Sequence, residues 1–208
     1  MNMNLLTADN LHLWRGDLHV LRGLTFGLPA GHCLQIMGPN GSGKSSLLRA
    51  LCGLLPLEAG RIAWREADVY RDLLAFQREL AYLGHSAGLK GDLTSLENLR
   101  FAVGLRRVVA DSVILQLLEQ MGIASRTRER LVRHLSAGQL RRVALARVLL
   151  SQCPLWILDE PNSNLDVGGQ RLLGERLQQH LEGGGCAVIA THQQLPLDPA
   201  RQLLLELN

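Results

Sequence analysis

The chain has 208 residues, of which 47% are hydrophobic and only 4% aromatic, so its core must consist mainly of Leu, Val, Ile and Ala. No apolar run reaches the roughly 18 residues of a membrane-spanning helix, and the N-terminus lacks the pattern of a signal peptide. The four cysteines are scattered, which favours buried thiols over a disulfide framework. The net charge of +3 conceals a basic segment, 100–147, with ten arginines and three acidic residues. This segment is either a solvated helical face or a surface for an anionic partner.

In chain order, residues 5–28 alternate apolar and polar positions between turn residues, which predicts two or three short antiparallel strands. The apolar run 33–38 ends in glycine and leads through a loop into a helical pattern over 45–55. The remaining pattern predicts strands over 80–83, 155–158 and 187–190, and helices over 71–78, 94–121, 139–150 and 168–181. This alternation predicts an α/β protein.

The stretch 94–121 is expected to contain two helices. Thr94 with Glu97 three residues later forms a capping box for the first helix, and Asp111 can cap the second, which ends at Gly122. We therefore expect an α-helical subdomain at about 86–135, inserted into the α/β core.

The stretch GPNGSGKSS, residues 38–46, has the phosphate-loop pattern G-x-x-x-x-G-K-[ST] between a predicted strand and a predicted helix. Its glycines permit a close backbone approach, and successive N–H groups with the helix N-terminus favour phosphate. Lys44 would place a positive charge on the β- and γ-phosphates, and the Ser45 hydroxyl would ligate Mg²⁺. The predicted nucleotide-binding residues are Gly38, Pro39, Asn40, Gly41, Ser42, Gly43, Lys44, Ser45 and Ser46.

The stretch LWILDEP, residues 155–161, predicts a buried strand that delivers Asp159 at its C-terminal end, where Mg²⁺ could be held together with Ser45. Glu160 could act as the general base on the attacking water. His192 follows a second buried strand and could contact the γ-phosphate, although a lone histidine at a strand end is often structural. With Lys44, these residues predict an ATPase or GTPase, and the guanine-specific N-K-x-D motif is absent.

The stretch LSAGQLRRVALARVLL, residues 135–150, resembles the signature of ATP-binding cassette (ABC) proteins, usually L-S-G-G-Q. The resemblance covers nearly the whole chain. It implies a P-loop NTPase core of the ABC type with a mixed sheet, an N-terminal antiparallel β-subdomain and the inserted α-helical subdomain, all within one nucleotide-binding domain, 1–208. It also implies that the signature of a second copy closes on ATP held by the phosphate loop, with contacts from Ser136, Ala137, Gly138 and Gln139.

Two further stretches extend this resemblance. Trp14 is similar to the aromatic residue that stacks on adenine, although a core or surface tryptophan is the alternative. NSNLD, residues 162–166, resembles the loop that touches the opposite subunit, but it departs from the usual S-A-L-D at Asn164.

His85 stands where most of the family has a glutamine that reaches Mg²⁺ and the attacking water. A neutral imidazole nitrogen can accept from a water or ligate a metal, so His85 could fill the same catalytic role. The alternative is that it has lost this contact and belongs to a hinge flanked by Gly84 and Gly88.

The finer resemblance is to the ATP-binding subunits of haem exporters in the cytochrome c maturation system. It rests on LGH at 83–85, GLKGDLTSLENLRF at 88–101 and THQ at 191–193, together with the signature. It implies an ATPase that drives haem export or release of a haem–chaperone complex, docked on integral membrane subunits at the cytoplasmic face of the bacterial inner membrane. Arg126, Arg128 and Arg130 could favour an acidic coupling helix or anionic lipid.

We expect ATP and Mg²⁺ as cofactors, no nucleic-acid partner and no direct contact between this chain and haem. Two alternatives stay open: the ATPase subunit of an exporter for another substrate, and a soluble ABC ATPase without a transport role.

Overall fold

The computed structural model of the protein describes residues 4–104, 107–193 and 195–207. The chain forms two compact units. The first comprises Met1–Tyr82, Cys153–Glu160 and Leu177–Asn208, and the second comprises Leu83–Gln152 and Pro161–Arg176. Among the described residues, no helix has both the length and the apolar character needed to cross a bilayer.

An antiparallel sheet in the first unit contains β1 (Asn4–Arg15), β2 (Leu18–Pro29), β4 (Ala59–Trp64) and β5 (Ala67–Asp68), in the order β2-β1-β4-β5. The predicted antiparallel strands are confirmed, but β1 and β2 each run for 12 residues instead of forming short pieces. Register shifts interrupt their pairing, for example between Ala8 and Leu11, and they break the alternation that marks a continuous strand in the sequence.

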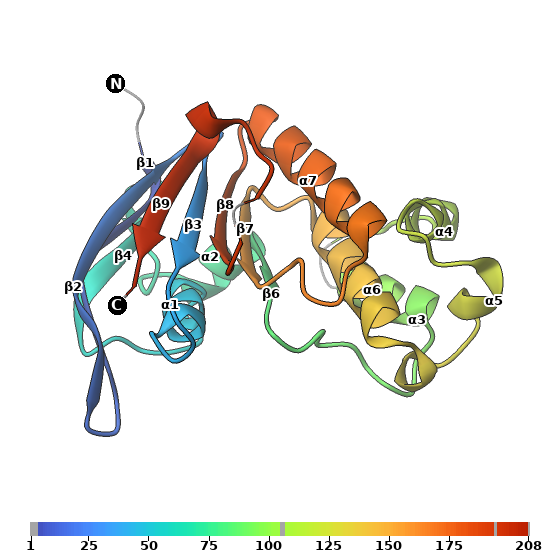
Figure 1. Cartoon of the computed structure of the whole chain (residues 1–208), viewed down its shortest axis with the longest axis horizontal. Coiled ribbons are helices and arrows are strands. Elements are labelled where there is room, and N and C mark those ends of the chain that lie inside the picture. Colours follow the sequence, from blue (N-terminus) through green and yellow to red (C-terminus); the bar gives the residue numbers. More distant parts are fainter. Residues whose placement is uncertain (1–3, 105–106, 194, 208) are drawn as a thin grey trace. The chain divides into compact units, whose positions relative to one another are not determined.

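The second sheet contains β3 (Cys33–Met37), β6 (Leu80–Leu83), β7 (Leu155–Asp159), β8 (Cys186–Ala190) and β9 (Gln202–Glu206), in the order β6-β7-β8-β3-β9 (Figure 1). The pairs β3–β8, β3–β9 and β7–β8 are parallel. Every residue of β7 and β8 is buried, as their continuous apolar sequences predict. The expected mixture of strand directions is thus divided between two sheets.

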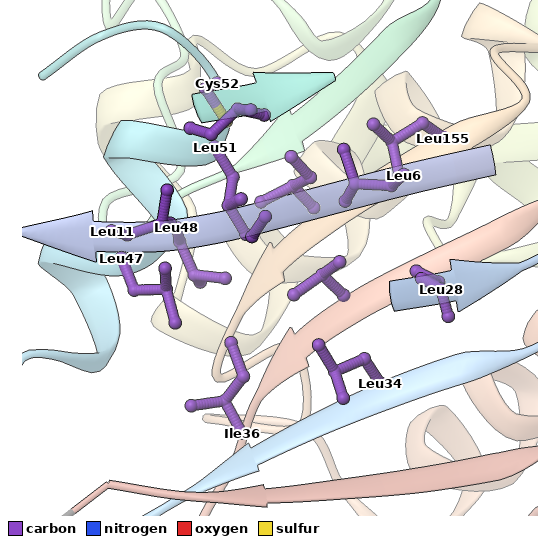
Figure 2. Packing of buried hydrophobic residues seen from close by; sticks show 14 of the residues in the cluster. Leu6, Leu11, Leu28, Leu34, Ile36, Leu47, Leu48, Leu51, Cys52 and Leu155 are labelled. Carbon is purple, nitrogen blue, oxygen red and sulfur yellow. The ribbon is translucent and has the colours of Figure 1, made fainter. Parts of the chain in front are cut away.

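A hydrophobic core of the first unit lies between the strands of these sheets and the helix α1 (Lys44–Leu51). Figure 2 shows Leu11 of β1 near Leu47 and Leu48 of α1, and Leu6 farther along β1 near Leu155 of β7. The first unit also contains α2 (Leu73–Arg78), whose first turn is capped by the Asp72 side chain, and the short helix η2 (Pro199–Arg201). This packing fixes α1, whose N-terminus follows the loop after β3.

The second unit contains α3 (Ser95–Gly104), α4 (Asp111–Gln120), α5 (Ser125–Arg128), η1 (Val132–His134) and α6 (Ala137–Ser151). The helix α7 (Val167–Glu182) begins in this unit. The capping box at α3 is confirmed, because Thr94 N–H donates to Glu97 Oε2 over 2.8 Å and Glu97 N–H donates to Thr94 Oγ1 over 3.3 Å.

Asp111 does not cap α4. Ala110 occupies the N-cap position, and Asp111 is the first helical residue. Its carboxylate accepts from Arg100 Nε over 3.0 Å, so the expectation of a side-chain cap was wrong. Gly122 follows α4 with a φ of 73°, as expected for the residue after a helix.

The basic segment 100–147 uses much of its charge inside the second unit. Arg107, Arg128, Arg141, Arg142 and Arg147 each donate to a backbone carbonyl, while Arg100 and Arg133 pair with carboxylates. Arg128 donates to the Ile123 carbonyl over 2.8 Å, and only 13% of its side chain is exposed. It is therefore a structural residue and not the partner-facing arginine we expected, whereas Arg126 and Arg130 are exposed.

Candidate functional site

The phosphate-loop residues join β3 to the N-terminus of α1 through a turn that only glycine fits at its end. Gly43, the residue before α1, has a φ of 98°. A Cβ at Gly43 would lie 2.3 Å from Val20 Cγ1 of β2. The backbone of this loop is therefore fixed both by its own conformation and by the strand packed against it.

Lys44 folds back over the loop that it follows. Its Nζ donates to the carbonyls of Gly38 and Pro39 over 2.7 and 2.8 Å, and the residue is only 7% exposed. An ammonium group has three N–H donors, so one hydrogen is not used by these two bonds. The positive charge is thus held in a set position at the loop.

The loop also contains a hydroxyl that suits an anion. Ser42 Oγ is buried and has no hydrogen-bond partner within the described part of the chain. A buried polar group without a partner costs about 1–3 kcal/mol, which a phosphate oxygen could offset by accepting its hydrogen. Ser45, in the first turn of α1, is exposed and can offer its hydroxyl to a hard cation. These groups fit a nucleotide phosphate with Mg²⁺.

Asp159 ends β7 and is buried, with 3% of its surface exposed. It lies at the C-terminal end of the parallel sheet, as does the phosphate loop after β3. Burial raises the pKa of the nearby Tyr82 hydroxyl, and the charge of Asp159 contributes to this shift. A buried carboxylate and an exposed serine hydroxyl are the oxygen ligands that Mg²⁺ accepts beside phosphates and water.

Glu160 combines a strained backbone with a specific side-chain partner. Its φ of 47° lies in the left-handed region, where a residue with a Cβ pays on the order of 1–2 kcal/mol. Its N–H donates to the Ala190 carbonyl at the end of β8 over 2.9 Å. Its Oε1 lies 2.7 Å from Nε2 of His192, so that nitrogen carries the shared hydrogen in the neutral ring. Two residues predicted separately are therefore brought together, in an arrangement strained as functional sites often are.

A threonine missed by the sequence interpretation shapes the turn that presents His192. Thr191 Oγ1 donates to the Gln193 carbonyl over 2.8 Å and accepts from Gln193 N–H over 3.1 Å. Thr191 N–H donates to the Ile36 carbonyl of β3. The signal was a threonine directly before the candidate histidine, since such hydroxyls favour local turns.

Trp14 lies near the end of β1 and is 46% exposed, which excludes the core alternative. One face of its indole is stacked on His19 of β2, with ring centroids 4.2 Å apart and planes inclined by 4°. His19 immediately precedes Val20, the residue that packs against Gly43. His19 of β2 therefore supports the indole of Trp14 on β1, next to the β2 residue that packs against the phosphate loop. No sequence pattern indicated this role for His19.

In the second unit, the signature residues form the first turn of α6. Ser136 is the N-cap, and its hydroxyl accepts from Gln139 N–H over 3.3 Å while Gln139 Oε1 accepts from Ser136 N–H over 2.9 Å. Ala137 is the first helical residue and is exposed. The Ala137 methyl, in place of the usual glycine hydrogen, is therefore accommodated at the surface.

The segment with the unusual Asn164 lies against Gly138 at the start of α6. A Cβ at Gly138 would lie 2.7 Å from the Asn164 carbonyl, so the 162–166 segment runs against the start of α6. Asn164 has a φ of 61°, a conformation that asparagine tolerates better than most residues with a Cβ. The asparagine therefore suits the local backbone.

His85 also belongs to the second unit and is exposed. The carbonyl of Gly84, before it, accepts from Arg141 Nη1 over 3.0 Å, and the carbonyl of Gly88, after it, accepts from Arg147 Nη1 over 2.7 Å. The loop is therefore anchored on both sides of the histidine.

Comparisons with known proteins agree with this geometry. The sequence model of the family described as "ABC transporter" matches residues 21–163. A protein of Albidiferax ferrireducens named "Cytochrome c biogenesis ATP-binding export protein CcmA" is 42% identical, over 98% of this chain and 97% of its own length. The protein of the same name from Dechloromonas aromatica is 44% identical, over 97% and 100%. A solved structure described as "Structure of ATP binding subunit of ABC transporter" has a TM-score of 0.78 and 27% identity, and the match covers 90% of this chain and 79% of that one.

Proposed function

Because the chain belongs to the ATP-binding cassette (ABC) transporter family, we propose that it is the ATP-hydrolysing subunit of a membrane transporter that serves cytochrome c biogenesis. The observation that carries the hydrolytic part is the 2.7 Å pair of Glu160 and His192, at the end of the sheet that also presents the phosphate loop. A triphosphate on that loop would place its last phosphate group toward a carboxylate able to accept a proton from water.

Binding depends on groups already oriented for an anion. Lys44 Nζ and the backbone N–H groups of residues 40–46 would contact the β- and γ-phosphates, and Ser42 Oγ would donate its hydrogen to a phosphate oxygen. Ser45 and Asp159 would hold Mg²⁺, which offsets phosphate charge when bound. Trp14 would offer its second face to adenine, because the first is covered by His19.

Hydrolysis would use the side chains at the ends of β7 and β8. Glu160 would orient the attacking water and accept its proton, while Nε2–H of His192 would hold the γ-phosphate. The same N–H now holds the Glu160 carboxylate, so His192 would exchange one acceptor for the other as nucleotide binds. His85 would contribute an imidazole nitrogen to the water or to Mg²⁺.

The signature residues would act on a second copy of the chain. Ser136, Ala137, Gly138 and Gln139 form the N-terminal turn of α6, which favours an anion, and Ser136 is exposed. Two copies would then enclose two ATP molecules, each bound by one phosphate loop and one signature. Residues 1–208 would act as one nucleotide-binding domain, with 86–135 as its helical subdomain.

The transport role rests on the named relatives and on the family resemblance. We place the chain at the cytoplasmic face of the inner membrane, docked on integral membrane subunits and driving export of haem or release of a haem–chaperone complex. The chain itself would contact neither haem nor nucleic acid. The cargo crosses the membrane subunits in this proposal, so the nucleotide site does not specify it.

One set of strains tests this function. A strain lacking the gene is complemented with the wild-type chain, with Lys44→Ala or with Glu160→Gln, and both ATP hydrolysis by the purified complex and the amount of haem-bearing c-type cytochrome are measured. We expect the two variants to lose hydrolysis at least 100-fold and to leave cytochrome c immature. Hydrolysis lost with normal cytochrome c would contradict the biogenesis role, and undiminished hydrolysis in both variants would contradict the active site.

A further inference from the structure

One buried arginine of α6 joins two segments that flank the candidate catalytic residues. Arg141 is 4% exposed. Its Nη1 donates to the Gly84 carbonyl over 3.0 Å, and its Nε donates to the Pro161 carbonyl over 3.4 Å. Gly84 directly precedes His85, and Pro161 directly follows Glu160. A single guanidinium thus binds the chain next to both residues.

A second arginine holds the far end of the His85 loop. Arg147, also on α6, donates from Nη1 to the Gly88 carbonyl over 2.7 Å. Arg147 is half-buried, and burial lowers the pKa of its guanidinium, so the Gly88 carbonyl offsets part of the cost of removing this charge from water. The segment 84–88 is therefore bound at both ends to the helix that begins with the signature.

The segment after Pro161 is bound to α6 as well. Arg142 Nη2 lies 2.5 Å from Asp166 Oδ1, and the start of α6 at Gly138 touches the backbone of Asn164. The helix therefore contacts this segment at both ends of 161–166. A displacement of α6 would move the backbone before His85 and the backbone after Glu160 together.

We propose that Arg141 is a positioning residue that couples the placement of the signature helix to His85 and to Glu160. This inference rests on the proposed ATPase function and deepens it. The guanidinium is planar and presents several donors at fixed spacing, so it can keep two carbonyls at a set separation. A lysine offers a single nitrogen and would hold one of them less rigidly. When phosphate engages the N-terminus of α6, the two catalytic segments shift as one.

The test compares Arg141→Gln, Arg141→Lys and Arg147→Gln with a matched control, Arg128→Gln. Arg128 also donates to a carbonyl in the second unit, that of Ile123, but it lies on α5 and binds neither segment. Each variant is made in the wild-type and in the His85→Ala background. The kcat and KM for ATP, the Kd for ATP·Mg and the melting temperature are measured on the complex of the full chain.

We expect Arg141→Gln to lower kcat at least tenfold while the Kd for ATP changes less than twofold. Arg141→Lys, which keeps the buried charge and the fold, should show an intermediate kcat. Arg147→Gln should lower kcat in the wild-type background only, because it acts through the His85 loop. Arg141→Gln should still lower kcat in the His85→Ala background, because the bond to Pro161 is lost too.

A kcat for Arg141→Gln and Arg141→Lys within twofold of that for Arg128→Gln would overturn the proposal. So would a fall in kcat that follows the melting temperature equally across all four variants. The parent function is judged separately by Lys44→Ala and Glu160→Gln. If those variants still hydrolyse ATP, the ATPase assignment fails, and if they do not, an unaffected Arg141→Gln refutes only the coupling.

Discussion

Glu160 reaches His192 across 2.7 Å from a backbone that has a left-handed φ of 47°. The strain is a property of the backbone and the pairing a property of the side chain, so substitutions can separate them. Glu160→Gln keeps a Cβ and therefore the strain, whereas Glu160→Gly removes both the strain and the carboxylate.

We expect Glu160→Gly to be more stable than Glu160→Gln by on the order of 1 kcal/mol, after the larger chain entropy of glycine in the unfolded state is counted. Both variants should hydrolyse ATP at least 100-fold more slowly than wild type. Denaturant unfolding and an ATPase assay measure the two effects. Equal stability of the two variants would mean that the protein does not hold this residue under strain.

Gly43→Ala should abolish nucleotide binding by closing the loop against Val20. The added Cβ would lie 2.3 Å from Val20 Cγ1, and the φ of 98° adds backbone strain. Gly184→Ala is the matched control, because Gly184 has a φ of 83° but no heavy atom within 4 Å of an added Cβ. Both variants should lose stability, and only Gly43→Ala should lose ATP affinity, by 100-fold or more in calorimetry. Loss of affinity in the control as well would assign the effect to global destabilisation.

Trp14→Ala should weaken ATP binding about tenfold, or roughly 1.4 kcal/mol, as expected for loss of one base–aromatic contact. Inorganic triphosphate should bind the variant and the wild type equally, because it has no base. Trp14→Phe should retain most of the affinity, and His19→Ala should give an intermediate value because the indole loses its 4.2 Å stacking partner. An equal loss of affinity for triphosphate would place Trp14 outside the base-binding site.

His180 should make the fold less stable in mild acid. Burial lowers the pKa of His180, although hydrogen bonds to the carbonyls of Cys186 and Pro154 partly counter this. The unfolded chain therefore takes up a proton more readily as pH falls below about 6.5, and stability is lost between that pH and the lower folded pKa. In the wild type the ring centroids of His180 and Trp156 are 3.9 Å apart. His180→Phe keeps an aromatic ring for this stacking but has no group that takes up a proton. Its melting temperature should fall less than that of wild type between pH 7.5 and pH 5.5, and identical falls would contradict this cause.

The double variant Arg126→Glu with Arg130→Glu should release the chain from membranes. Of the three arginines 126, 128 and 130, these two are exposed and can meet an acidic coupling helix or anionic lipid. Membrane recovery after fractionation and the melting temperature are measured. The double variant should keep its melting temperature, whereas Arg128→Glu should lower it by breaking the bond to the Ile123 carbonyl. Full membrane recovery of the double variant would show that docking uses another surface.

Motifs with a local cause were predictable from the sequence. The phosphate loop, the buried strands β7 and β8 and the Thr94 capping box each depend on residues within one short stretch, and all three have the expected local structure. The continuous length of β1 and β2 was not predictable, because bulges such as that near Ala8 interrupt the period-2 pattern.

Features that depend on contacts between distant residues could not be predicted. The Glu160–His192 pair, the support of Trp14 by His19 and the carbonyl bonds of Arg141 join residues that no periodicity relates. The basic segment illustrates the same limit, since a sequence counts charges but does not reveal which ones bind backbone oxygens. Asp111 fits the pattern of a cap, yet Arg100 is its partner instead.

β9 was also missed, and its position has a consequence for biosynthesis. β9 pairs with β3, which is the earliest strand of that sheet to be translated, and Leu207 N–H donates to the Met37 carbonyl next to the phosphate loop. An added Cβ at Gly38 would lie 2.2 Å from the Leu207 carbonyl, so the two segments touch closely. A nascent chain on the ribosome therefore exposes one edge of β3 until about residue 207 has emerged, and the start of the nucleotide loop lacks its contact with Leu207 until then.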